Sequence, residues 1–263
     1  AEAVAHLARE SGLENVEILE VNGSLPYVYG EWLNKPGAPT VLLYAHHDVQ
    51  PTGDIKRWET APFEPTEKDG RLFGRGTADD KAGVVATLSA IASYLKSAKE
   101  LPLNVKVIFE GEEEIGSTNL EHLINEYKEK LYADFVVLSD TENYDIGVPA
   151  VTTQLRGIVT CEVTVSALSQ PVHSGAFGGP IPDPVQSLAK LIGKLTDEDG
   201  KMNIPGIYDD VAELTKEEKE NLRALPFDLE MFRHHSCLLD GVSLTGEKDF
   251  TPNEQICFSR LFL

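Results

Sequence analysis

Side chains that could bind metal ions gather in four short clusters in the first 140 residues of the sequence. The clusters are His46–Asp48, Asp79–Asp80, Glu112–Glu114 and Asp140. Each follows a stretch predicted to be a strand, and in open α/β sheets functional sites lie beyond the carboxyl ends of the strands. We therefore expect the clusters to meet at one edge of a sheet. Carboxylates with few histidines suit zinc, manganese or cobalt, and such ions support hydrolysis by an activated water.

His46 and Asp48 lie two residues apart, so on a strand their side chains point to the same side. Asp48 can then bind metal itself or orient the imidazole of His46, whereas His47 points the other way. A surface turn is the alternative for this motif.

Asp79 and Asp80 open a predicted helix, where an Asp is ordinarily an N-cap or a first-turn residue. The spacing does not choose between these two aspartates as a metal ligand.

Three adjacent glutamates at Glu112–Glu114 repel one another, and a solvated acidic loop is the ordinary interpretation of such a run. Here, however, the run directly follows a buried strand, and a cation would relieve the repulsion. Two divalent ions carry four positive charges, which nearly balance the five carboxylates of Asp48, Asp79, Glu113, Glu114 and Asp140. A two-metal centre would therefore allow these side chains to crowd together.

The elements that must position these clusters alternate between strand and helix. Apolar runs predict buried strands at Thr40–Ala45, Asn104–Phe109 and Asp134–Leu138, and helical spacing predicts helices at Lys81–Ser97 and Asn119–Leu131. This alternation predicts an α/β domain over residues 1–153, with a mostly parallel sheet and helices on both faces.

The pattern changes near residue 153. The second part has a strand of period two at Gly157–Val165, helices at Val185–Leu195 and Thr215–Leu225, and a final strand at Glu254–Leu263. It predicts a smaller α+β domain over residues 154–263.

Composition excludes several classes of protein. The sequence has 23 Lys and Arg against 43 Asp and Glu, a net charge of −20, so we expect neither nucleic acid nor an anionic membrane as a partner. The sequence has 3 cysteines without CxxC spacing, which fits a reducing compartment. We see no stretch that could span a membrane and no signal peptide at the start of the sequence, and we expect a cytoplasmic location.

Five motifs together resemble a known family. They are YAHHDVQP (44–51), GRGTADDKAG (74–83), FEGEEEIGS (109–117), LSDT (138–141) and PVHSGAFGG (171–179). Their order and spacing resemble the di-zinc metallopeptidase family of carboxypeptidase G, the aminoacylases, acetylornithine deacetylase and the carnosinase-type (cytosolic nonspecific) dipeptidases. RWETAPFEPTEKDGRLFGRG (57–76) and IPGIYDDV (204–211) resemble the dipeptidase branch in particular.

The resemblance implies a metal-ligand set. His46 and Asp140 match ligands of the first metal, Asp79 matches the carboxylate that bridges both metals, and Glu114 matches a ligand of the second. The family has a last histidine ligand of the second metal in a C-terminal segment, and nothing after Asp140 matches it. We therefore expect this chain to be a portion of a longer enzyme that holds the second ion weakly.

The resemblance also implies three catalytic roles. Asp48 matches the residue that orients the histidine ligand, and Glu113 matches the general base. His173 matches a histidine of the smaller, lid domain that reaches the partner subunit's active site and stabilises the oxyanion. Without the resemblance, His173 would be interpreted as an ordinary loop histidine.

These expectations lead to three hypotheses. The first is a dipeptidase that dimerises through the lid domain and holds two divalent ions. We expect these ions to be zinc, with manganese or cobalt as the alternatives. The second is an N-acyl amino-acid deacylase of the same family, which a panel of dipeptides and N-acetyl amino acids would distinguish. The third is a catalytically incompetent module for metal binding or dimerisation, which a metal count would distinguish.

Overall fold

The computed structural model describes residues 1–21, 23–141, 143–152, 155, 157, 159–248 and 250–257. The chain divides into two compact units, Ala1–Thr152 (unit 1) and Thr153–Leu263 (unit 2). Each unit is described by itself.

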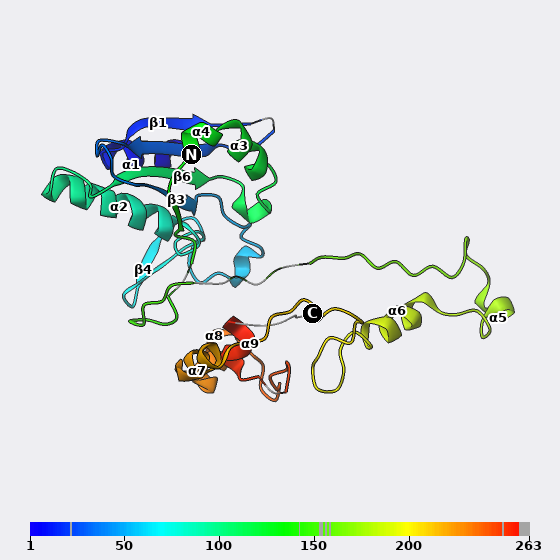
Figure 1. Cartoon of the computed structure of the whole chain (residues 1–263). Helices are drawn as coiled ribbons and strands as arrows, with labels where there is room; N and C mark the ends of the chain where they lie inside the picture. The colour runs from blue at the N-terminus through cyan, green and yellow to red at the C-terminus, as the bar shows by residue number, and fades with distance from the viewer. Residues whose placement is uncertain are drawn as a thin grey trace. The chain divides into compact units, whose positions relative to one another are not determined.

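Unit 1 is built on a five-stranded sheet in the order β1-β2-β6-β3-β7 (Figure 1). The strands are β1 (Glu14–Leu19), β2 (Tyr27–Trp32), β3 (Thr40–His46), β6 (Asn104–Glu110) and β7 (Phe135–Leu138). β3 pairs in parallel with β6 and β7, whereas β2 runs antiparallel to β1 and β6. Four strands therefore share one direction and β2 opposes them, which confirms a mixed α/β unit with a mostly parallel sheet.

Four helices pack on this sheet: α1 (Glu2–Glu10), α2 (Lys81–Ser97), α3 (Leu120–Glu126) and α4 (Lys128–Leu131). The alternating side chains of the strands divide between two apolar clusters. Val105, Val107 and Phe109 of β6 pack with α1 and α2, whereas Ile108 packs in a second cluster with α3 and α4. The helix predicted over Asn119–Leu131 is interrupted at Tyr127, which separates α3 from α4.

Short elements connect these parts. η1 (Ile55–Arg57) is a 3₁₀ turn, and β4 (Thr66–Lys68) pairs with β5 (Arg71–Phe73) in a separate two-stranded sheet. Asp79 and Asp80 therefore follow a strand that lies outside the main sheet. They reach the site because they begin α2, not because a sheet strand ends there.

β7 differs from its prediction as a buried strand. Its four residues, Phe135, Val136, Val137 and Leu138, are 61%, 58%, 47% and 55% exposed. The reason is position: among the described residues, β7 is the last strand of the sheet and has β3 as its neighbour. The apolar composition that predicts burial is real, but no described segment covers the strand.

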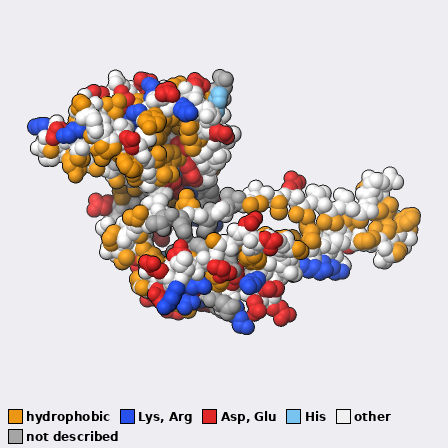
Figure 2. Space-filling view, viewed as in Figure 1, with side chains coloured by type: hydrophobic (Ala, Val, Ile, Leu, Met, Phe, Trp, Pro, Cys, Tyr) orange, Lys and Arg blue, Asp and Glu red, His pale blue; other side chains and the backbone are white. Residues whose placement is uncertain are grey.

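Unit 2 contains the helices α5 (Ser174–Phe177), α6 (Pro184–Ile192), α7 (Lys216–Ala224), α8 (Leu229–His235) and α9 (Pro252–Cys257). Figure 2 shows apolar side chains exposed along the α5–α6 segment. Phe177, Val185 and Ile192 are exposed apolar residues of this segment. Leu214 is the one buried apolar residue among the described residues of this unit.

The two strands predicted for unit 2 are wrong where the structure describes them. The described part of Gly157–Val165 forms no strand, because no described segment runs beside it to pair with its backbone. Within Glu254–Leu263, residues up to Cys257 belong to α9, which begins at Pro252; residues 258–263 lie outside the described residues. Proline at the first position favours a helix start over a strand. The predicted helices Val185–Leu195 and Thr215–Leu225 are confirmed as α6 and α7.

Candidate metal centre

His46 is the last residue of β3 and its side chain is fully buried. Its Nε2 lies 2.8 Å from Asp79 Oδ1 and its Nδ1 lies 3.1 Å from Asp48 Oδ1. The backbone N–H of His46 donates to Asp80 Oδ2 at 3.1 Å. Strand β3 thus aims one imidazole at the carboxyl end of the sheet, with an aspartate against each ring nitrogen.

Two further carboxylates lie near Nε2 of His46. Glu113 Oε2 lies 3.8 Å and Asp140 Oδ2 lies 3.9 Å from His46 Nε2. One ligand atom from each of these three residues can be chosen so that all lie within 4.8 Å of one another. An imidazole and two carboxylates at this spacing fit a divalent ion of the zinc, manganese or cobalt type.

The charges of this group leave a mark on its pKa values. Burial raises the pKa of Glu113, and the nearby Asp140 and Glu114 raise it further against the opposing effect of His46. Burial likewise raises the pKa of Asp140, with Asp79 and Glu114 adding to it. A cation bound among these acids would favour their ionised forms.

The pKa of His46 is raised by the negative charges around it. Burial lowers it, but the hydrogen bond with Asp79 and the charges of Asp140, Asp48 and Glu113 together raise it above the ordinary value. In the absence of a cation, a proton on His46 is therefore the positive charge that the carboxylates attract. A metal ion bound there would take the place of that proton.

Asp48 connects the histidine to the glutamate run. Its Oδ1 faces His46 and also accepts a long hydrogen bond from the N–H of Glu113 at 3.3 Å, while its Oδ2 accepts from the N–H of Glu114 at 3.0 Å. The carboxylate of Glu114 in turn accepts from Gln50, through the backbone N–H at 3.1 Å and through Nε2 at 2.8 Å. Glu114 therefore lies beside the three-residue group, held by Gln50.

The sequence left open which of Asp79 and Asp80 is a helix N-cap and which is a candidate metal ligand. Asp80 is buried and is the N-cap of α2, since its Oδ1 accepts from the N–H of Gly83 at 3.0 Å. Asp79 points instead at His46. Asp80 therefore has the N-cap role, whereas the metal-ligand role of Asp79 stays a prediction; a non-proline cis peptide joins the two residues.

Glu112 does not share the site of the two glutamates that follow it. Its carboxylate is buried on the inner side of the loop, against Tyr27 and Asn119. Glu110, Gln50, Tyr27 and Tyr44 also belong to the surroundings of the site and were missed by the sequence reasoning. Gln50 lies within the motif YAHHDVQP, and the charged Glu110 at the end of a largely apolar strand was a second signal.

His173 lies in unit 2, where it is exposed and caps the short helix α5. Its Nδ1 accepts a hydrogen bond from the N–H of Gly175 at 3.1 Å. The other predicted site residues belong to unit 1, and the role of His173 stays a prediction. The individual roles of the predicted site residues in unit 1 also stay predictions. These residues are His46, Asp48, Asp79, Glu113, Glu114 and Asp140.

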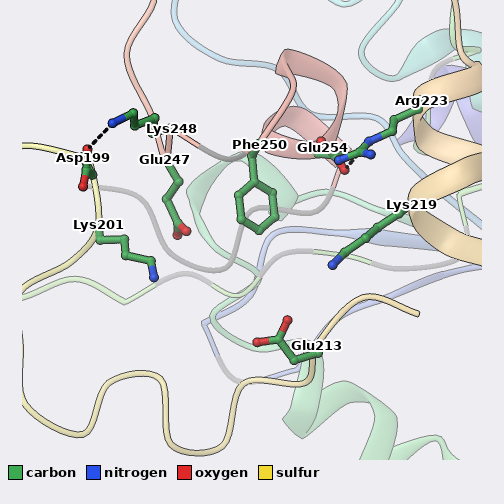
Figure 3. A pocket seen from close by; sticks show the side chains of 9 residues that line it. All are labelled: Asp199, Lys201, Glu213, Lys219, Arg223, Glu247, Lys248, Phe250 and Glu254. Atoms are coloured by element: carbon green, nitrogen blue, oxygen red, sulfur yellow. Dashed lines mark hydrogen bonds and ion pairs between the residues drawn. The ribbon is translucent and has the colours of Figure 1, made fainter. Parts of the chain in front are cut away.

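Unit 2 also contains a charged cavity of about 330 Å³ around Phe250. Lys201 and Lys219 extend their ammonium groups toward its centre from opposite sides, and the carboxylate of Glu247 also points toward it (Figure 3). The cavity is lined by four basic and four acidic side chains, and none of the predicted site residues lies in it.

None of the helices within the described residues has the length and apolar character needed to cross a membrane.

The chain is similar to curated dipeptidases over most of its length. Over 213 residues the chain is 39% identical to Beta-Ala-His dipeptidase of Rattus norvegicus, covering 80% of this chain and 43% of the relative. It is 39% identical over 208 residues to a Cys-Gly metallodipeptidase of Schizosaccharomyces pombe, covering 78% and 44%. The chain thus spans less than half the length of these curated relatives.

Solved structures give the same picture. An M20 family metallo-carboxypeptidase from Sulfolobus solfataricus is similar with a TM-score of 0.72 and 31% identity, over 97% of this chain and 57% of that one. Human carnosine dipeptidase 1 is similar with a TM-score of 0.67 and 29% identity, over 97% and 54%. Residues 42–228, which contain every predicted site residue, match the peptidase family M20/M25/M40, and the chain belongs to that family.

Proposed function

We propose that the whole protein is a metal-dependent dipeptidase that hydrolyses the peptide bond of dipeptides or short peptides. The observation that carries the proposal is the convergence of His46, Glu113 and Asp140 within 4.8 Å at the end of the sheet. Relatives whose names describe dipeptidases support the substrate class. The N-acyl amino-acid deacylase remains the alternative activity of this site.

The proposed centre holds two divalent ions, and zinc is the metal that we propose. His46 and Asp140 would hold one ion, Glu114 the other, and Asp79 would lie between them. When bound, the ions would polarise the peptide carbonyl and lower the pKa of water. In support, these are carboxylates and one imidazole, a donor set that such ions accept.

The chain's own residues would move the proton. Glu113 takes a proton from the water that attacks the carbonyl carbon, and returns it to the amine nitrogen as the C–N bond breaks. The raised pKa of Glu113 supports this role, because a base that works near neutral pH needs a pKa above that of an ordinary carboxylate. Asp48 would orient His46 through Nδ1.

The proposed architecture assigns residues 1–153 to the metal-binding catalytic domain and residues 154–263 to a smaller α+β lid domain. The two apolar clusters of unit 1 support a sheet covered by helices on both faces. The lid would form the contact of a cytoplasmic homodimer, in which His173 serves the partner subunit's site. Charge argues against nucleic acid or anionic membrane as a partner, since the chain carries a net charge of −20.

The test is Glu113→Gln in the whole protein, assayed with dipeptides and N-acetyl amino acids after zinc loading. We expect hydrolysis to fall at least about a hundredfold while the zinc content stays at two ions per chain. Asp140→Asn is the comparison, because it should lower the zinc content as well. Near wild-type hydrolysis by the zinc-loaded Glu113 variant would refute the base assignment, and faster cleavage of N-acetyl amino acids would favour the deacylase.

A further inference from the structure

Glu112 is buried directly beside the proposed centre, although it faces away from it. Its side chain is 1% exposed. We propose that Glu112 is a positioning residue, whose carboxylate holds the loop that presents Glu113 and Glu114 to the metal site. This inference rests on the proposed function, because it takes the metal site as the object that Glu112 positions.

The carboxylate of Glu112 is fully used by hydrogen bonds. Oε1 accepts from the Tyr27 hydroxyl at 2.8 Å and from the Asn119 N–H at 2.7 Å. Oε2 accepts from the Leu25 N–H at 3.2 Å and from Asn119 Nδ2 at 3.2 Å. Four donors match the roughly four acceptor positions of a carboxylate. A buried carboxylate without such donors would strongly destabilise the unit, so this geometry is selective for an acid at position 112.

These bonds join both ends of the loop between β6 and α3. Glu112 lies at the start of the loop, and Asn119, the N-cap residue of α3, lies at its end. The Asn119 side chain makes no capping bond to α3 and donates to Glu112 instead. The backbone oxygen of Glu112 also accepts from the N–H of Ser117 at 2.9 Å. One residue therefore closes this loop through its main chain and its side chain.

Two carboxylates hold this loop from opposite sides. Asp48 accepts the N–H groups of Glu113 and Glu114 on the side of the site, and Glu112 accepts Asn119 and Leu25 on the inner side. Asp48 also contacts His46, whereas Glu112 contacts none of the proposed ligands. Its effect on the metal must therefore pass through the position of the loop.

Tyr27 extends the arrangement to the strand end that carries His46. Its hydroxyl lies 2.8 Å from Glu112 and 3.2 Å from Glu110, the residue that pairs with His46 across β3 and β6. Tyr44 donates to the other oxygen of Glu110 at 2.7 Å. The loop and the strand end are thus connected by buried hydrogen bonds.

The test compares Glu112→Gln with Glu121→Gln in the whole protein. Glu121 is an exposed residue in the first turn of α3, so its variant makes the same change of charge nearby. In Glu112→Gln the new NH₂ group must face donors, which breaks part of the cage. We expect zinc affinity, measured by competition with a chromophoric chelator, to fall about tenfold. We also expect amide hydrogen exchange of residues 113–119 to become at least about tenfold faster.

A residue with only a structural role would give a different result, in which exchange accelerates throughout unit 1, including α2, and the melting temperature falls in proportion. The proposal requires exchange to accelerate in the loop while α2 stays protected, and kcat for a dipeptide to fall more than KM changes. Tyr27→Phe, which removes one donor, should give a smaller change in the same direction and serves if Glu112→Gln does not fold.

Weaker zinc binding without faster exchange of residues 113–119 would overturn the proposal, and so would affinity and exchange equal to those of Glu121→Gln. The failure of the proposed function looks different. In that case the wild-type protein would bind zinc without cleaving either substrate class, while the exchange of the loop would still report the role of Glu112.

Discussion

Asp48 accepts a hydrogen bond from the backbone N–H of Glu114 at 3.0 Å. Through its other oxygen it lies 3.1 Å from His46 Nδ1. A single carboxylate therefore sets the ring of one proposed ligand and the main chain of another. The relative position of the two strand ends depends on it.

Asp48→Asn tests this double contact. The amide keeps one acceptor but turns an NH₂ group toward either His46 Nδ1 or the N–H of Glu114, and one of the two bonds is lost. We expect zinc affinity of the whole protein to fall about 10- to 100-fold, measured by chelator competition. Asp54→Asn is the control, because Asp54 caps the exposed turn η1; an equal loss of affinity there would contradict the prediction.

Stability of the metal-free protein should depend on pH with a definite sign. The pKa values of His46, Glu113 and Asp140 are all raised in the folded state, so the folded state binds more protons there than the unfolded one. The contribution of protonated His46 is full below about pH 6.5 and is lost as the pH rises through its raised pKa, whereas ionisation of the two acids already costs stability above about pH 4.

We therefore expect the melting temperature of the metal-free protein in EDTA to fall between pH 5 and pH 8 through this group. Zinc should oppose that fall, because metal binds the deprotonated ligands and gains affinity as the pH rises. His46→Gln should flatten the metal-free profile, and His122→Gln, at an exposed position of α3, should not. A profile unchanged by His46→Gln would count against the electrostatics described here.

Gly111→Ala tests the close approach of the strand end to its neighbours. A Cβ at Gly111 would lie 2.2 Å from the backbone oxygen of Pro26 and 3.0 Å from His47 Cε1. The backbone must move to admit it, and we expect a loss of about 1–3 kcal/mol in the free energy of unfolding, measured by urea denaturation. Gly157→Ala is the matched control, because a Cβ there has no described heavy atom within 4 Å.

Mixing two inactive variants tests the proposed role of His173 in a partner subunit. Glu113→Gln lacks the base and His173→Ala lacks the lid histidine. A dimer with one chain of each kind would keep one complete site, so random exchange of equal amounts should restore about a quarter of wild-type activity. Activity that stays absent after verified subunit exchange would place His173 in its own chain's site.

The sequence predicted the parts of unit 1 that local pattern determines. Apolar runs located β3 and β6, and the spacing of Val84, Leu88 and Ile91 located α2 with its observed bounds. The rule that sites follow strand ends brought His46 and Asp140 together correctly. Spacing alone could not separate Asp79 from Asp80, because both satisfy the pattern of a helix start and only the turn of the chain decides which one faces His46.

Long-range partners explain what pattern could not supply. Glu112 looks like its two neighbours in sequence, yet donors from Leu25 and Tyr27, more than 80 residues away, draw its carboxylate inward. The alternation in Gly157–Val165 is real, but a strand needs a second strand to accept its hydrogen bonds. The described residues offer none there.

The uncovered face of β7 has a practical consequence for anyone who prepares this protein. Four consecutive apolar side chains on β7, the last strand of the sheet among the described residues, form a template on which further chains can add by backbone pairing. Unit 1 expressed alone should therefore self-associate at high concentration. A lysine in place of Val137, which is 47% exposed, would act as a gatekeeper and keep the unit dispersed.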